Sequence, residues 1–277
     1  MHMSERGSFV REALIVTAAR WRRLPCVVSI HGAGFVAFSE RRPRLVSHVL
    51  GMACAVTVLG EDAHAAVRRV NPRLHLELIP NPVTLDATAG PVQETSELVL
   101  FAGEIGLRKG ADVLARAWKT VAARRPQARC VMLGPRTGLP IPTAPRLEVL
   151  APVGRDEVRQ FIRRARVIAL PSRGEALPMI LAEAGAAGRP FVSTPVGGIE
   201  LLAGGGTIVP VGDHEALADA LTSFLASPES AQAVGELGRR ICDERMSPQV
   251  IDTLLRRLYA YASTRARRPN GMPIPAA

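Results

Sequence analysis

Residues 167–198 constrain the fold more than any other stretch, because they read as a strand, a loop, a helix and a second strand in immediate succession. The apolar run over 167–170 has the length of a buried strand. Pro178 suits the first turn of a helix, which we predict over 179–187. A second short apolar run follows over 191–193. Buried strands joined through a helix indicate a parallel α/β sheet.

The loop that enters this helix has the features of an anion site with carboxylates on either side. Backbone N–H groups at the start of a helix lack partners within the helix, and the helix dipole favours negative charge there. We predict that Ala176, Leu177 and Met179 supply these N–H groups. Glu175 in the loop and Glu183 on the helix can accept hydrogen bonds from hydroxyls, which suits a sugar linked through a diphosphate to a nucleoside. Two glutamates at this spacing also fit an ordinary solvent-facing surface.

The wider string favours the first interpretation. E-A-L-P-M-I-L-A-E-A, followed by G-R-P and V-G-G, resembles the E-x7-E signature of retaining GT-B glycosyltransferases of family 4, the glycosyl transferases group 1. The resemblance implies that Glu175 binds hydroxyls of the donor sugar and that Glu183 binds the ribose. It also implies that the amides of residues 176–179 bind the diphosphate.

A glycine-bearing loop over 103–110 forms the other half of the predicted site. It follows a strand and enters a helix, and it places Lys109, one of only two lysines in the chain, near a helix start. A cation there is unfavourable without a nearby anion. By resemblance, Lys109 neutralises the departing diphosphate and Gly103 lies beside it. The family has Arg where this chain has Glu104, so Arg108 is a candidate for the missing charge. A solvated basic loop is the alternative.

His31 ends a predicted strand next to glycine. A lone histidine in such a place is commonly structural, but ligands bind at the carboxyl ends of parallel strands. By resemblance, His31 would face the donor sugar, and we include it with Lys109 and Glu175 as a candidate catalytic residue.

Strands and helices alternate along most of the chain, the pattern of a parallel α/β fold. We predict strands over 26–30, 55–59, 75–79, 98–101, 129–133, 146–150, 167–170, 191–193 and 206–210. We predict helices over 8–19, 43–53, 61–70, 109–124, 156–165, 179–187, 213–226, 230–245 and 248–262.

Residues 83–96 contain few large apolar residues and show no periodicity, so we predict a linker there and a domain boundary near residue 90. The resemblance covers roughly residues 4–262 and matches only the last strands of the first GT-B domain. We therefore predict a partial N-terminal Rossmann-like domain over 1–90, on the acceptor side. A complete nucleotide-sugar domain with a helical tail follows over 91–262, and a disordered tail over 263–277.

Composition limits the partners. The net charge of +10 arises almost entirely from arginine, and no nucleic-acid-binding motif accompanies it, so we expect no nucleic acid partner. A cluster of basic residues around one tryptophan suggests contact with an anionic membrane, although such clusters are commonly just solvated. It comprises Arg20, Trp21, Arg22, Arg23, Arg41, Arg42 and Arg44. The four cysteines and six histidines show no metal-ligand spacing, so we expect no metal and no cofactor other than the donor substrate.

No apolar stretch approaches the length of a membrane span, and no signal peptide is visible. We therefore expect a cytoplasmic protein, or one bound peripherally at the inner face of the membrane. The prediction is a glycosyltransferase that moves a sugar from a nucleotide-sugar donor to a glycan or lipid-linked acceptor. The resemblance implies retention of configuration and a role in cell-surface polysaccharide biosynthesis. The alternative is a truncated, inactive module that binds nucleotide-sugar or a partner protein.

Overall fold

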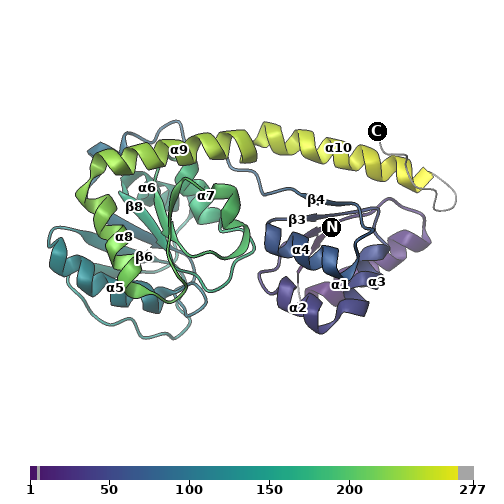
Figure 1. Cartoon of the computed structure of the whole chain (residues 1–277), viewed down its shortest axis with the longest axis horizontal. Helices are drawn as coiled ribbons and strands as arrows, with labels where there is room; N and C mark the ends of the chain where they lie inside the picture. Colours follow the sequence, from purple (N-terminus) through teal and green to yellow (C-terminus); the bar gives the residue numbers. More distant parts are fainter. Residues whose placement is uncertain (5–6, 268–277) are drawn as a thin grey trace. The chain divides into compact units, whose positions relative to one another are not determined.

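The computed structural model describes residues 1–4 and 7–267. The chain divides into two compact units (Figure 1). Unit 1 comprises Met1–Asn81 with Gln249–Ala277, and unit 2 comprises Pro82–Pro248. Each unit contains one sheet, and every strand pair in both sheets is parallel.

Unit 1 contains sheet A, whose four short strands lie in the order β1-β2-β3-β4. Its core is aliphatic with a few phenylalanines, among them Phe9 and Phe35. The last helix returns to this unit, because Ile251 and Leu258 pack against Ala55 and Ile79. The strands are β1 (His2–Met3), β2 (Val27–Ile30), β3 (Ala55–Val58) and β4 (Leu76–Leu78); the helices are α1 (Gly7–Trp21), α2 (Phe35–Arg41), α3 (Pro43–Gly51), α4 (Glu61–Val70) and α10 (Pro248–Arg267).

Unit 2 contains sheet B, with six strands in the order β10-β9-β8-β5-β6-β7. The chain winds outward from β5 through β6 to β7, then crosses back to β8 and continues through β9 to β10. The direction of winding therefore reverses between β5 and β8. The strands are β5 (Leu98–Ala102), β6 (Arg129–Leu133), β7 (Leu147–Leu150), β8 (Val167–Leu170), β9 (Phe191–Ser193) and β10 (Gly206–Ile208).

Helices cover both faces of sheet B, as a buried parallel sheet requires. Right-handed crossovers in opposite directions place α5 and α7 on opposite faces. Helix α8 packs against α5, and α6 and α9 pack against α7 (Figure 1). The helices are α5 (Ala111–Arg124), α6 (Arg155–Arg164), α7 (Met179–Ala186), α8 (His214–Ala226) and α9 (Pro228–Met246); two 3₁₀ segments are η1 (Val92–Glu94) and η2 (Gly197–Leu202).

The predicted α/β class with two parallel sheets is confirmed, and all nine predicted strands and all nine predicted helices are present with ends shifted by a few residues. Strand β1 and helix α2 were not predicted. The disordered tail predicted from 263 is wrong for residues 263–267, which continue α10, and the remainder lies outside the described residues. The domains also differ from the prediction: unit 2 begins at Pro82, and α10 groups with unit 1 because its apolar side packs on β3.

Candidate functional site

Both loops singled out in the sequence follow the strands at which the winding of sheet B reverses. Residues 103–110 follow β5, and residues 171–178 follow β8, its neighbour in the sheet. In open parallel sheets, ligands bind outside the carboxyl ends of the strands at such a reversal. The topology of unit 2 therefore brings the two loops to one place.

Backbone packing fixes the two loops against each other. Gly110, the N-cap residue of α5, has a left-handed φ of +73°, and a Cβ on it would lie 1.9 Å from the carbonyl oxygen of Pro171. Only glycine permits this approach. Across the same junction, Arg173 donates two hydrogen bonds of 2.8 Å to the carboxylate of Asp112 and a further one to the Leu107 carbonyl. The Arg173 guanidinium lowers the pKa of Asp112, so this carboxylate stays charged.

The junction brings Lys109 and Glu175 into a direct ion pair. Lys109 Nζ lies 2.6 Å from Glu175 Oε1, and their side chains are only 16% and 7% exposed. Ser172 Oγ donates to the same carboxylate oxygen at 2.7 Å. The other oxygen, Oε2, accepts no hydrogen bond from any residue that the structure describes. The pair thus keeps one acceptor available beside a half-buried cation.

The amino end of α7 presents backbone donors next to this pair. Pro178 stands at the N-cap position, and no side chain caps the helix. Within the described part of the chain, the N–H groups of Ala176, Leu177 and Ile180 donate no hydrogen bond. Ala176 and Leu177 were predicted donors, and Met179 opens the helix as expected. Ile180 was not predicted.

Glu183 lies in the second turn of α7 in a poorly solvated position. Its side chain is 28% exposed, and the nearest cation, Arg155 Nη2, is 3.9 Å from Oε1. Burial raises the pKa of Glu183, and the charges of Arg155 and Arg159 only partly oppose this. A carboxylate that is desolvated without a close partner is typical of binding and catalytic sites.

Gly103 and Arg108 occupy the β5 loop in different ways. The N–H of Gly103 continues the sheet ladder by donating to Leu133, and a Cβ on Gly103 would lie 3.8 Å from Lys109 Cε. Arg108 lies 3.5 Å from Glu104 and donates to the Gly174 carbonyl. The unusual acid in this loop is therefore paired with the arginine that was predicted to supply the missing charge.

His31 follows β2 in unit 1, and its ring is held by a residue that the sequence did not suggest. His31 Nε2 lies 2.7 Å from His2 Nδ1, with the ring centroids 4.6 Å apart. Burial and the charge of His2 lower the pKa of His31. Because His31 belongs to the other unit, its predicted position facing the donor sugar stays a prediction.

Sequence reasoning missed Asp112 and Arg173, the side chains that hold the loops together. They are 61 positions apart, and no local motif connects them. Among residues 1–4 and 7–267, no three His, Cys, Asp or Glu side chains are grouped so as to hold a metal ion. In the same ranges, no helix has the length and apolar character needed to cross a bilayer.

Comparison of the sequence and the fold with known proteins identifies a family. Residues 96–227 match the family model described as glycosyl transferases group 1. A D-inositol 3-phosphate glycosyltransferase of Xylanimonas cellulosilytica is 33% identical over 222 residues, which are 71% of this chain and 51% of the relative. The enzyme of that name from Saccharomonospora viridis is 33% identical over 68% of this chain and 48% of its own length. The chain thus spans about half the length of these curated relatives.

Two solved structures show the same fold. Sucrose-phosphate synthase of Thermosynechococcus elongatus superposes with a TM-score of 0.75 at 21% identity, over 95% of this chain and 73% of that one. Anabaena HepE in complex with UDP superposes with a TM-score of 0.76 at 17% identity, over 90% of this chain and 75% of that one. The chain therefore has a GT-B type of fold and belongs to the glycosyl transferases group 1, the family matched by residues 96–227.

Proposed function

We propose that unit 2 binds the diphosphate and sugar of a nucleotide-sugar donor at the junction of the β5 and β8 loops. The observation that carries the proposal is the half-buried Lys109–Glu175 pair beside the uncapped amino end of α7. The pair lies at the reversal of sheet B, the free amides of Ala176 and Leu177 directly follow Glu175 in the chain, and the similar HepE structure was solved with UDP. UDP is accordingly the first nucleotide to test.

Each group in the site has a distinct role in this proposal. The diphosphate accepts hydrogen bonds from Lys109 and from the free amides before α7, and these donors stabilise the charge that develops as the diphosphate leaves. Glu175 accepts a sugar hydroxyl through Oε2, and Glu183 accepts the ribose hydroxyls. Because fixed cations and helix N–H groups neutralise the leaving group, donor binding needs no metal. Transfer proceeds with retention of configuration, the acceptor hydroxyl attacking from the leaving-group face.

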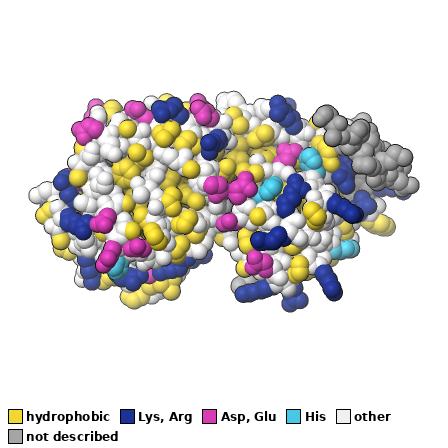
Figure 2. Space-filling model, in the orientation of Figure 1, with side chains coloured by type: hydrophobic (Ala, Val, Ile, Leu, Met, Phe, Trp, Pro, Cys, Tyr) yellow, Lys and Arg dark blue, Asp and Glu magenta, His cyan; other side chains and the backbone are white. Residues whose placement is uncertain are grey.

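The acceptor in this proposal is a glycan or a lipid-linked molecule of cell-surface polysaccharide biosynthesis, reached from the cytoplasmic face of the membrane. Helix α1 supports a membrane contact, because Val10, Leu14 and Trp21 form an exposed apolar stripe at helical spacing, and Trp21 is 82% exposed. Arg20 and Arg22 flank the stripe, and basic side chains project over much of the visible face of unit 1 (Figure 2). Binding to anionic but not neutral vesicles, with a blue shift of Trp21 fluorescence, tests this contact.

The alternative function is a module that binds the nucleotide-sugar, or a partner protein, without turnover. A turnover assay on the chain alone separates the two, since only an enzyme releases free nucleoside diphosphate as product.

Removal of the Lys109 amine tests donor binding directly. In calorimetric titration with UDP, we expect Lys109→Ala to weaken binding by at least tenfold, the effect of losing a charge-assisted contact to phosphate. Lys119→Ala is the matched control, because Lys119 is the other lysine and is exposed on α5. EDTA should leave the affinity unchanged. Equal UDP affinity for the Lys109→Ala and Lys119→Ala variants would contradict the assignment.

A further inference from the structure

A cavity in unit 2 lies at the opposite edge of sheet B from the loops described above. It has a volume of about 360 Å³, within the range of small-molecule pockets, and is formed by the segment 90–96, the first residues of β5 and β6, and helix α6. Leu98 and Arg129, which begin those strands, place it at the amino-terminal edge of sheet B. The nucleotide loops follow the opposite edge, separated by the length of a five-residue strand, roughly 15 Å.

Four arginines line this cavity, and only two of them are neutralised. Arg129 pairs with Glu148 at 2.7 Å, and Arg163 pairs with Asp86 at 2.6 Å. Arg164 and Arg189 form no ion pair with any described residue. The cavity therefore carries excess positive charge.

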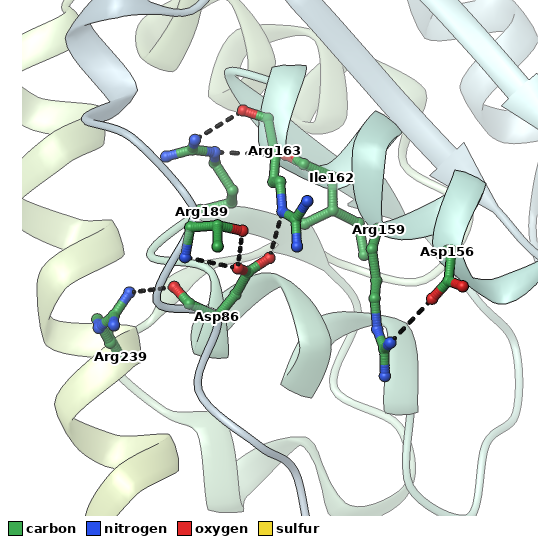
Figure 3. A network of polar contacts seen from close by, with 8 residues as sticks. Asp86, Asp156, Arg159, Ile162, Arg163, Arg189 and Arg239 are labelled. Carbon is green, nitrogen blue, oxygen red and sulfur yellow. Dashed lines mark hydrogen bonds and ion pairs between the residues drawn. The ribbon is translucent and has the colours of Figure 1, made fainter.

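Arg189 is the unusual member of this group, because it is only 2% exposed. Its Nε donates to the Ile162 carbonyl at 3.3 Å, and Nη2 donates to the Arg163 carbonyl at 2.6 Å, at the carboxyl end of α6 (Figure 3). Nη1 donates no hydrogen bond within the described residues. A buried guanidinium with unused donors and no carboxylate partner carries a desolvation cost that a bound anion would offset. Burial lowers the pKa of Arg189 to about 10, which leaves it charged at neutral pH.

The rest of the cavity wall supplies groups of a different chemistry. Glu94 and Ser96 line it, and neither side chain has a hydrogen-bond partner in the described chain, so a carboxylate and a hydroxyl are available to sugar-like hydroxyls. Phe161, Leu98 and Val131 provide an apolar wall. A bare inorganic anion would use the arginines and leave these groups without a contact.

We propose that this cavity binds a small hydroxylated phosphate monoester, with the phosphate on Arg164 and Arg189 and the hydroxyls on Glu94 and Ser96. The site is separate from the donor site and does not depend on it.

Calorimetric titration of the full chain with glucose 6-phosphate and with glycerol 3-phosphate tests the proposal. We expect at least one ester to bind, glucose not to bind, and inorganic phosphate to bind more weakly than the ester. Arg164→Gln should weaken ester binding about tenfold, the effect of losing a charge-assisted hydrogen bond. Arg164 is exposed and unpaired, so its replacement leaves the fold intact.

Controls separate this site from the donor site. Arg240→Gln removes another exposed arginine of unit 2 that lies outside the cavity and has no ion-pair partner among the described residues, and it should leave ester binding unchanged. Arg164→Gln should keep UDP affinity within twofold, whereas Lys109→Ala should keep ester affinity. The proposal is overturned if neither ester binds at millimolar concentration, if inorganic phosphate binds as tightly as the esters, or if Arg164→Gln and Arg240→Gln behave alike.

Discussion

At the scale of single residues, the two glutamates of the site differ in how well they are satisfied. Glu175 receives a lysine and a serine hydroxyl at hydrogen-bond distance on one oxygen. Glu183 is partly buried, with its nearest cation 3.9 Å away, and burial raises its pKa. Contacts inside the protein therefore fix the position of the Glu175 carboxylate. The Glu183 carboxylate would gain close hydrogen-bond partners from the hydroxyls of a bound ligand.

Glu183 should contribute to binding and oppose folding. Because its pKa is raised in the folded state, the unfolded chain ionises first, and stability falls as the pH rises through the range between the two pKa values. We expect Glu183→Gln to lower UDP affinity about fivefold in calorimetry. In urea unfolding at neutral pH, the same variant should be as stable as the unaltered chain or more stable.

Glu157→Gln provides the comparison, since Glu157 is an exposed acid on α6 with no side-chain partner in the described chain. It should change neither measurement. A Glu183→Gln variant that loses stability and keeps its UDP affinity would show that Glu183 is structural.

At the scale of elements, the site depends on how closely the start of α5 approaches the β8 loop. Gly110 makes this approach possible, and the Arg173–Asp112 pair spans the same junction. Lys109 immediately precedes the glycine, so its amine is positioned by backbone contact and not by its flexible side chain alone.

We expect Gly110→Ala to lower the free energy of unfolding by about 3 kcal/mol, of which about 1 is left-handed strain and the remainder the clash with Pro171. Gly212→Ala isolates the strain, because Gly212 has a φ of +83° and open space around its Cβ position. It should lose about 1 kcal/mol. Similar losses in urea unfolding of the two variants would contradict close packing at the junction.

The sequence predicted the elements that have clear local signals and missed the two that lack them. Strands such as β5 and β8 are uninterrupted apolar runs closed by proline or glycine, and their ends follow those signals. Strand β1 has two residues, too few for any periodicity, and α2 begins after Gly34 without a capping side chain. Both were therefore missed.

In the candidate site too, the features with local sequence signals were predicted and the others were not. Lys109, Glu175 and Glu183 could be predicted from the sequence because local signals mark them. These signals are the glycines of the β5 loop, Pro178 before α7, and the two acids on either side of that proline. The contacts that these three side chains make in the folded protein could not be predicted from the sequence. The Lys109–Glu175 ion pair, the Arg173–Asp112 pair and the hydrogen bond from Arg108 to the Gly174 carbonyl all join residues dozens of positions apart. Only the packing of the two loops brings them together.

At the scale of the whole molecule, the segment that joins the two sheets is anchored to unit 2 and is not a free linker. Asp86 donates its N–H to Ala186, accepts from Arg163 at 2.6 Å and from Arg239 at 2.9 Å, and so contacts α6, α7 and α9 (Figure 3). Burial alone would raise the pKa of Asp86, but the hydrogen bonds from Arg163 and Thr88 outweigh it and bring the pKa to about 2. The segment 83–96, which was predicted to be a linker because it has few large apolar residues, therefore binds to unit 2 through the polar contacts of Asp86.

The Asp86 contacts should make unit 2 sensitive to acid. Because the folded pKa lies below the ordinary value, the contribution is complete above about pH 4 and is lost as the pH falls toward 2. We expect Asp86→Asn to be less stable by about 1 to 2 kcal/mol near neutral pH, and the difference from the unaltered chain to shrink on acidification. Urea unfolding across this pH range measures it; a difference that does not vary with pH would show that the charge of Asp86 is unimportant.

The ion pair between Lys109 and Glu175 also bears on selectivity. Because Glu175 already neutralises Lys109, a simple anion would have to break this ion pair and leave the carboxylate without its cation. A donor that carries both a diphosphate and hydroxyls can take the lysine with one end and satisfy the glutamate with the other. If the proposed donor site is correct, the internal ion pair therefore favours molecules that carry both a diphosphate and hydroxyl groups.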